Sequence, residues 1–382
     1  MSISKIIFDR PLISVCFTVC PAFVSKIYFI FFFYFNKKLV DIFKICAIIY
    51  LKLLIQKNQS CHFNNLIKGG INMIYTVTLN PALDKTVEIP SLTVDSVNRI
   101  TAMRTDPGGK GINVSKVIHK LGKESIAAGI LGGDTGHAIE SALKAMGLTT
   151  SFRFVKGETR TNLKVIDPVN HTNTDINEPG VTVSEEILTE VLQELLDKLT
   201  DQDIVVISGS MPKGSPKNTY YTWVKACKNA GAKVILDADG DLLAAALHAS
   251  PYLIKPNNHE LSDLLGKPLK TTEDLTNAAR DLMEQHHISK IVVSMGGEGA
   301  LYVTKDETVY AEGLKVPVGS TVGAGDSVVA ALAVAEESAM SLEDTVRLFT
   351  ATGAANVMCS GTQAAEYDVI EGLIPKVVLH RL

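Results

Sequence analysis

Residues 321–326 read Thr-Val-Gly-Ala-Gly-Asp, and a run of small and aliphatic residues, Ser327 to Ala331, follows them directly. This pattern predicts a tightly packed helix that begins at the glycines. Backbone N–H groups at the start of a helix have no partner within the helix and stabilise negative charge. Asp326 stands where an acidic side chain can take a proton from an attacking hydroxyl. An aspartate that only caps its helix would give the same pattern, so the motif alone leaves both interpretations open.

A second glycine-rich stretch, residues 108–113, reads Gly-Gly-Lys-Gly-Ile-Asn and also precedes a predicted helix. Glycines let the backbone approach a ligand closely, the helix start favours anions, and Lys110 adds a positive charge. The stretch is not a Walker A motif, which requires Gly-x-x-x-x-Gly-Lys followed by Ser or Thr. Taken alone, it is equally typical of a structural turn.

Two more segments bring oxygen-bearing side chains next to predicted strands. Asn257 and Glu260, within Lys255–Glu260, are three residues apart, so one helical turn places both on one face. Such oxygen ligands suit Mg²⁺, directly or through water, although the same spacing is a capping-box pattern. Asp84 follows the strand-like run Ile74–Leu79, and either accepts hydrogen bonds from sugar hydroxyls or is an ordinary turn residue.

Arg160 and Asn162 lie in residues 158–162 (ETRTN), within a polar segment that alternates like a β-strand. Arginine favours bidentate recognition of phosphate, and a solvent-exposed arginine is the alternative interpretation. Residues 208–212 (SGSMP) follow another predicted strand and are consistent with a ligand-facing loop or a plain turn.

From Met73 onward, short β-rich runs alternate with amphipathic helical stretches, which predicts an α/β fold with a mainly parallel central sheet and helices on both faces. Residues 84–106 and 152–180 break this alternation, and we expect them to form a small β-sheet that projects as a lid. We expect a hairpin over Ala300–Tyr310 and helices over residues 325–337 and 341–357 to close the domain.

Residues 1–72 differ sharply from the rest of the chain. They hold ten of the 13 Phe residues and carry a net charge of +7, against −11 for the remainder. A membrane segment or a signal peptide would explain the apolar runs, but Lys26 interrupts them and no clear cleavage site follows. Our leading hypothesis is a leader translated from a mis-assigned start, with Met73 as the natural first residue. Phe, Ile, Lys, Asn and Tyr, which A/T-rich codons encode, fill more than half of the segment, and Lys68-Gly69-Gly70 can be encoded by a ribosome-binding sequence.

Charge and cysteine usage exclude several classes of protein. The whole chain has a formal charge of −4, so it has no global basic field to attract nucleic acid. Only Cys227 and Cys359 follow Met73, without metal-type spacing, which is consistent with a reducing compartment. We therefore expect a cytoplasmic protein that binds neither nucleic acid nor, if residues 1–72 are spurious, a membrane.

Together, and in this order, the motifs resemble those of the ribokinase-like (PfkB) carbohydrate kinases. The resemblance covers essentially all of residues 73–382, and the pairing of the GGKGINVS and TVGAGD motifs is highly specific. It implies a three-layer sandwich with a small β-sheet lid and a kinase that uses ATP and Mg²⁺. Residues 1–72 have no counterpart in the family.

The resemblance also assigns roles to individual residues. The resemblance implies an anion hole and a catalytic base formed by Gly323, Ala324, Gly325 and Asp326. Those expected to bind substrate are Asp84, Gly108, Gly109, Lys110, Asn113, Arg160 and Asn162, with Lys110 and Arg160 on the existing phosphate. Those expected at the nucleotide and its Mg²⁺ are Lys255, Asn257, Glu260, Ser294, Gly296, Gly299, Thr321 and Asn356, with Asn257 and Glu260 reaching the metal through water.

Within the family, the segments TLNPALD, ETRTN, SGSMP and STVGAGD are similar to those of the phosphosugar branch. The resemblance implies ATP-dependent phosphorylation of fructose 1-phosphate at its 6-hydroxyl, giving fructose 1,6-bisphosphate, in a homodimer formed through the lid. Phosphorylation of tagatose 6-phosphate is the alternative activity. A sugar-phosphate-binding regulator without catalysis is an alternative of another class, against which the intact Asp326, Asn257 and Glu260 argue.

Overall fold

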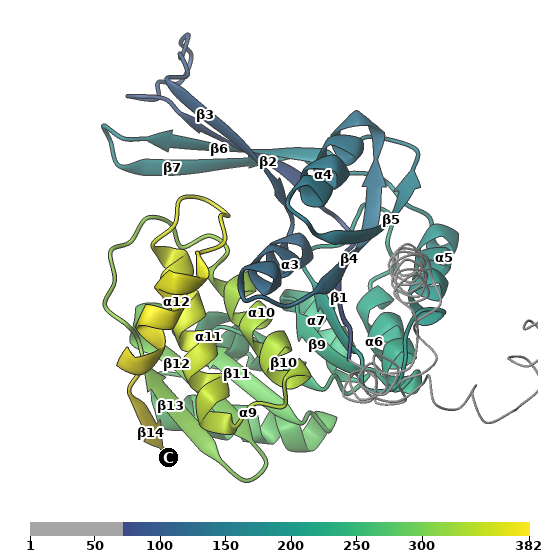
Figure 1. Cartoon of the computed structure of the whole chain (residues 1–382), viewed down its shortest axis with the longest axis vertical. Coiled ribbons are helices and arrows are strands. Elements are labelled where there is room, and N and C mark those ends of the chain that lie inside the picture. Colours follow the sequence, from purple (N-terminus) through teal and green to yellow (C-terminus); the bar gives the residue numbers. More distant parts are fainter. Residues whose placement is uncertain (1–71) are drawn as a thin grey trace, which may run out of the picture. The chain divides into compact units, whose positions relative to one another are not determined.

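A ten-stranded sheet runs through the computed structural model, which describes residues 72–382 (Figure 1). The interpretations of residues 1–71 fall outside this described part. The strands in spatial order are β14 (Leu379–Arg381), β13 (Thr308–Glu312), β12 (Gly299–Thr304), β11 (Lys290–Ser294), β10 (Leu253–Ile254), β9 (Lys233–Asp237), β8 (Ile204–Ser208), β1 (Ile74–Thr78), β4 (Ser125–Gly132) and β5 (Thr149–Val155). In this order, the strands from β11 through β5 are parallel to one another, whereas β12, β13 and β14 continue the sheet antiparallel.

Helices cover both faces of this sheet, because successive strand residues point to opposite sides. Val205 and Ile207 of β8 belong to one core, whereas Ile204 and Val206 belong to the other. The first core packs under α5 (Glu185–Leu196), α6 (Thr219–Asn229), α7 (Gly240–Leu247), α8 (Asn258–Leu265) and α9 (Thr272–His286). The second packs under α3 (Lys110–Lys120), α10 (Ala324–Glu337), α11 (Leu342–Val357) and α12 (Tyr367–Leu373), and α4 (Gly133–Ala145) packs beside α3 in a smaller cluster. This is the three-layer, ribokinase-like arrangement that the sequence predicted.

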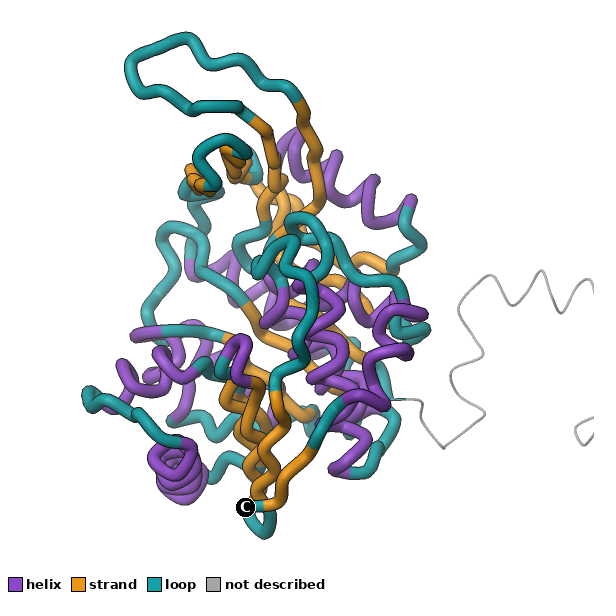
Figure 2. Tube along the Cα trace, turned by 90° about the vertical axis from the view of Figure 1, so that its left-hand side faces the viewer, coloured by secondary structure: helices purple, strands orange, loops and turns teal. Residues whose placement is uncertain are grey.

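The lid is a separate four-stranded sheet that stands away from the main sheet (Figures 1 and 2). Its order is β3 (Ala102–Gly108), β2 (Ala82–Glu88), β6 (Arg160–Asp167) and β7 (Thr172–Asn177), with β2 and β6 parallel and both outer pairs antiparallel. The predicted lid segments therefore lie in the lid, except at one end. Residues 152–155 belong to β5 of the main sheet, where Phe152 and Phe154 pack against the α4 cluster.

The end of the chain differs from the prediction, because α11 does not close the domain. The chain continues through α12 and a short 3₁₀ turn (Ile374–Lys376) to β14, which pairs with β13 at the edge of the sheet. A three-residue strand with little apolar character carries too weak a pattern to be seen in the sequence. The predicted hairpin is present as β12 and β13. Within residues 72–382, no helix combines the length and the apolar character that crossing a membrane requires.

Candidate active site

The main pocket lies at the carboxyl ends of the parallel strands, beneath the lid, and has a volume of about 1070 Å³. This is where ligands bind in open α/β sheets, because loops from neighbouring strands converge there. Its walls come from the strand ends of β1, β8, β9, β10 and β11, from the starts of α3 and α10, and from the underside of the lid.

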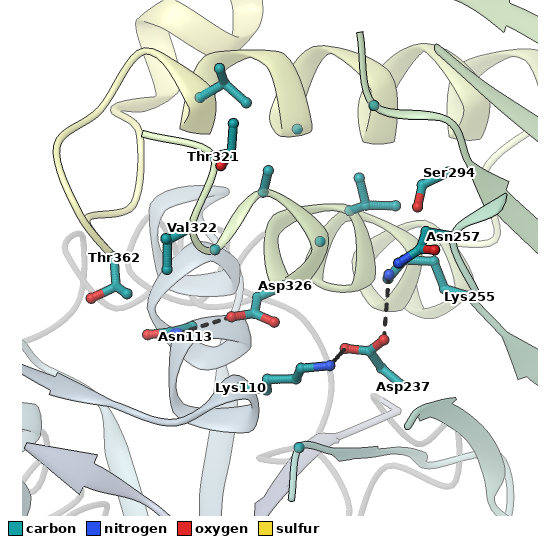
Figure 3. A pocket seen from close by; sticks show the side chains of 18 of the residues that line it. Lys110, Asn113, Asp237, Lys255, Asn257, Ser294, Thr321, Val322, Asp326 and Thr362 are labelled. Atoms are coloured by element: carbon teal, nitrogen blue, oxygen red, sulfur yellow. Dashed lines mark hydrogen bonds and ion pairs between the residues drawn. The ribbon is translucent and has the colours of Figure 1, made fainter. Parts of the chain in front are cut away.

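Asp326 lies in the first turn of α10 and lines the pocket (Figure 3). Gly323, at the N-cap, has a φ of 81°, a conformation that glycine adopts without strain. Asn113 of α3 donates from Nδ2 to Asp326 Oδ2 at 2.9 Å, so the two glycine-rich motifs meet at one carboxylate. The first amides of α10 and the base candidate therefore face the same space.

Asp237, at the end of β9, is a site residue that the sequence interpretation missed. It is 3% exposed, and its carboxylate oxygens lie 3.4 Å from the ammonium groups of Lys110 and Lys255 (Figure 3). Ser208 also donates to it at 3.1 Å. Burial works to raise the pKa of Asp237, but the two lysines hold it below the ordinary value. The available signal was an acidic residue directly after the strand-like run Lys233–Leu236.

The pKa of Asp326 is raised to about 6, first by burial and then by the negative charge of Asp237. Its hydrogen bond from Asn113 and the charges of Lys110 and Lys255 oppose this shift. A carboxylate with a pKa closer to neutrality is a stronger base while still being ionised at pH 7. The electrostatics of the pocket thus favour proton transfer to Asp326.

Asn257 and Glu260 form the capping box of α8, while both also line the pocket. Asn257 Oδ1 accepts from the amides of His259 and Glu260, and Glu260 Oε2 accepts from the amide of Asn257. Oε1 of Glu260 has no hydrogen-bond partner among residues 72–382, so it can accept from a metal-bound water. No cluster of three or more acidic, His or Cys ligands occurs in that part of the chain. The residues fit an Mg²⁺ that keeps its waters and is held mainly by substrate phosphates.

The opposite side of the pocket is built from the base of the lid. Asn162 of β6 donates from Nδ2 to Asp84 Oδ1 at 3.0 Å, and burial raises the pKa of Asp84. Gly108 packs against Asp84, and a Cβ at that position would displace the carboxylate of Asp84 from its present place. Arg160 Nη2 donates to the carbonyl of Asn80 at 3.0 Å and lies 3.4 Å from Ser210 Oγ.

Several buried polar atoms around this side have no hydrogen-bond partner in the described structure. They include Arg160 Nε, Asn162 Oδ1, Asn113 Oδ1 and Thr78 Oγ1. An unpartnered buried polar group costs about 1–3 kcal/mol, so such groups rarely persist without a role. A ligand rich in hydroxyl and phosphate oxygens would give them partners.

Most of the residues that the sequence nominated line this one pocket, and the exceptions are Gly108 and Asn356. Gly108 lies behind Asp84, and Asn356 supports the start of α10 by donating to the carbonyl of Val322 at 3.3 Å. Lys110 points toward Asp237, on the side of Asp326 (Figure 3). Arg160 lies beside Asn80 and Ser210.

Comparison with known proteins agrees with this architecture. The fold is that of the ribokinase-like carbohydrate kinases. The chain belongs to the pfkB family of carbohydrate kinases, whose model matches residues 77–368. It is 37% identical over 310 residues to 1-phosphofructokinase of Bacillus subtilis, an alignment that covers 81% of this chain and 100% of that relative.

Two solved structures are also similar. Phosphofructokinase-2 of Escherichia coli in complex with potassium has a TM-score of 0.76 and 32% identity, covering 80% of this chain and 99% of the other. The tetrameric inhibited form of the same enzyme has a TM-score of 0.74 and 31% identity, with the same coverage.

Proposed function

We propose that this kinase transfers the γ-phosphoryl group of ATP to the 6-hydroxyl of fructose 1-phosphate, giving fructose 1,6-bisphosphate and ADP. The observation that carries the proposal is that Asp326, with its raised pKa, and Arg160, with an unpartnered Nε, face one pocket. One side chain suits a reacting hydroxyl and the other suits a phosphate already on the sugar. The relative in Bacillus subtilis, whose whole length is covered by the alignment with this chain, is a 1-phosphofructokinase.

In the proposed mechanism, Asp326 accepts the proton of the 6-hydroxyl as its oxygen attacks the γ-phosphorus. The first-turn amides of α10, from Gly323 to Asp326, stabilise the negative charge of the transferring group. Lys110 and Lys255 add positive charge on the same side, and Asp237 keeps both ammonium groups in place. Phosphoryl transfer needs little more than this alignment and charge stabilisation.

On the sugar side, Arg160 binds the 1-phosphate. Asp84 accepts hydrogen bonds from sugar hydroxyls, and Asn162 exchanges hydrogen bonds with them through its amide. We assign Lys110 to the transferring phosphoryl group rather than to the 1-phosphate, because its ammonium lies beside Asp237 and near Asp326. The lid would exclude water, which would otherwise compete with the sugar as acceptor.

On the nucleotide side, ATP would lie against the end of β10, the β11–β12 loop and the segment just before α10. The residues assigned to ATP are Lys255, Ser294, Gly296, Gly299 and Thr321. Asn356 supports the segment before α10 through its hydrogen bond to the carbonyl of Val322. Glu260 would hold Mg²⁺ through water, and Asn257 would position Glu260 through the capping box of α8. The ion would neutralise negative charge on the phosphates of ATP.

We further infer a homodimer formed through the lid. Val87 and Val165, paired in the middle of the lid, are already buried with Ile89 and packed against Leu92, whereas Leu163 pairs with Ile176 toward the outer edge of the lid. At its two edges, Met103 of β3 is 60% exposed and Ile176 of β7 is 56% exposed. Exposed apolar side chains at the edges of the lid form a surface that a second copy of the chain can cover.

A coupled assay of ADP release with a panel of phosphosugars tests the proposed reaction. We expect the highest kcat/KM with fructose 1-phosphate. A higher value with tagatose 6-phosphate would establish the alternative kinase activity. Binding of phosphosugars without any turnover would establish the non-catalytic regulator instead.

A further inference from the structure

Lys116 is a buried lysine that the proposed mechanism does not use. It lies on α3, one turn after Asn113, and is 8% exposed. Its ammonium donates to the carbonyl of Pro107 at 2.9 Å and to the carbonyl of Thr362 at 3.1 Å. Burial lowers the pKa of Lys116, so a charged lysine at this position is costly and needs a compensating role.

The two carbonyls belong to segments that support different walls of the active site. Pro107 directly precedes Gly108, which packs against Asp84 on the sugar side. Thr362 belongs to the loop after α11 and lines the pocket near the start of α10 (Figure 3). A Cβ on Gly323, the N-cap of α10, would lie 3.9 Å from Thr362 Cα. One ammonium group therefore contacts both the sugar-binding turn and the loop beside the phosphoryl-binding amides.

Arg104 of β3 makes a second link between the same two walls. Its Nη2 donates to the carbonyl of Ser360 at 2.9 Å, while its Nε pairs with Asp106 at 2.6 Å. Gly361 has a φ of 63°, and a Cβ there would collide with the Arg104 guanidinium. Two cations from different elements thus hold residues 360–362 against the base of the lid.

We propose that Lys116 is a positioning residue that fixes the sugar-binding turn and the 360–362 loop relative to each other. This inference rests on the proposed function, because it concerns the alignment of the acceptor hydroxyl with the transferring phosphoryl group. Each substrate binds mainly to its own wall, so each can still bind when the link is lost. Transfer between them depends on their mutual placement, where an error of about 1 Å costs on the order of 100-fold in rate.

The test compares Lys116→Met with wild type. Methionine keeps the length and apolar stem of the side chain but donates no hydrogen bond. We expect kcat at saturating substrates to fall by about 10–100-fold. Dissociation constants of ATP alone and of the phosphosugar alone, measured by calorimetry, should stay within about threefold. Lys116→Arg keeps the charge and the donors and should recover part of kcat.

Lys120→Met is the matched control. Lys120 lies one turn further along α3, and its ammonium contacts Glu366 at 2.6 Å on the surface. Its removal should leave kcat unchanged, because surface ion pairs contribute little and this one lies outside the pocket.

A Lys116→Met enzyme that keeps more than about half of the wild-type kcat would overturn the proposal. So would a fall in kcat matched by an equal loss of binding of both substrates, because a general structural defect predicts that result. If Lys116→Met does not fold, Arg104→Ala decides: a kcat reduced at least about threefold supports the proposal, and an unchanged kcat overturns it. Wild type is assayed first, and an absence of turnover with fructose 1-phosphate would contradict the proposed function alone. The ratio of the kcat of Lys116→Met to that of wild type is then measured with whichever phosphosugar wild type phosphorylates.

Discussion

Asn113 and Asp326 are 213 residues apart in the sequence, yet Asn113 Nδ2 lies 2.9 Å from Asp326 Oδ2. This hydrogen bond joins the start of α3, on the sugar side, to the start of α10. It leaves Asn113 Oδ1 buried and without a partner among the described residues. The same amide can therefore orient the base and contact the substrate.

Activity should depend on pH through Asp326. Its pKa is raised to about 6, and only the ionised carboxylate can accept a proton. We expect kcat to be constant near neutral pH and to fall as the pH drops through about 6. Asp237→Asn removes a negative charge that disfavours ionisation of Asp326, so the midpoint should move to lower pH. Burial, the larger cause, remains, so the shift should be partial.

The measurement is kcat against pH at saturating substrates for both proteins. An acid limb that stays in place in Asp237→Asn would show that Asp237 does not control the ionisation of Asp326. A limb that moves to higher pH would contradict the sign of the interaction.

Arg160→Ala should raise KM for the phosphosugar far more than KM for ATP. Loss of a charge-assisted contact costs about 1.5–3 kcal/mol, or roughly 10–150-fold in binding. Arg153→Ala is the control, because Arg153 pairs with Glu190 and Glu194 on the surface, away from the pocket. Equal KM values for the phosphosugar in the two variants would show that Arg160 does not bind the phosphosugar.

Ile176→Glu should weaken the proposed dimer. It places a charge at the exposed edge of the lid, where exposed apolar side chains would meet a second copy. Light scattering after gel filtration should show a dimer for wild type and a larger monomer fraction for the variant. Lys305→Glu is a charge change in the turn between β12 and β13, away from the lid, and should leave the mass unchanged. A wild type that is already monomeric would refute the dimer.

A polypeptide that begins at Met73 should fold and be as active as the full chain. Every residue assigned to the pocket follows Met73, whose backbone N–H donates to Asp203 at 2.8 Å. Its melting temperature should lie within a few degrees of that of the full chain. Circular dichroism and the same coupled assay measure this, and a shortened chain that is unfolded or inactive would refute the hypothesis of a mis-assigned start.

Local patterns predicted much of the fold and many of the pocket residues. The alternation of apolar runs predicted the mainly parallel sheet, although β4 was not predicted and residues of β5 were assigned to the lid. The two glycine-rich motifs identified the starts of α3 and α10. These features are local, since glycine runs and helical spacing act within a few residues. The assignment of residues 152–155 to the main sheet and the presence of β14 did not follow from such patterns, because membership of a sheet depends on a distant partner.

The remaining site features arise from tertiary placement. Asp237 gains its role only because β9 brings it between Lys110 of α3 and Lys255 after β10. The contact of Arg160 with the carbonyl of Asn80 likewise depends on where the lid strand β6 lies relative to the segment after β1. Neither relationship has a signature in spacing along the chain, and both require the folded sheet.

Turnover of Asp326→Asn, measured with saturating ATP and fructose 1-phosphate, tests most directly whether this pocket performs the transfer. Asparagine has nearly the same shape but cannot accept the proton, while the first-turn amides of α10 remain. We predict that kcat falls by about 10²–10⁴-fold, while calorimetry still shows both substrates bound. A variant that keeps more than about a tenth of wild-type turnover would contradict the account, because Asp326 would then only cap its helix.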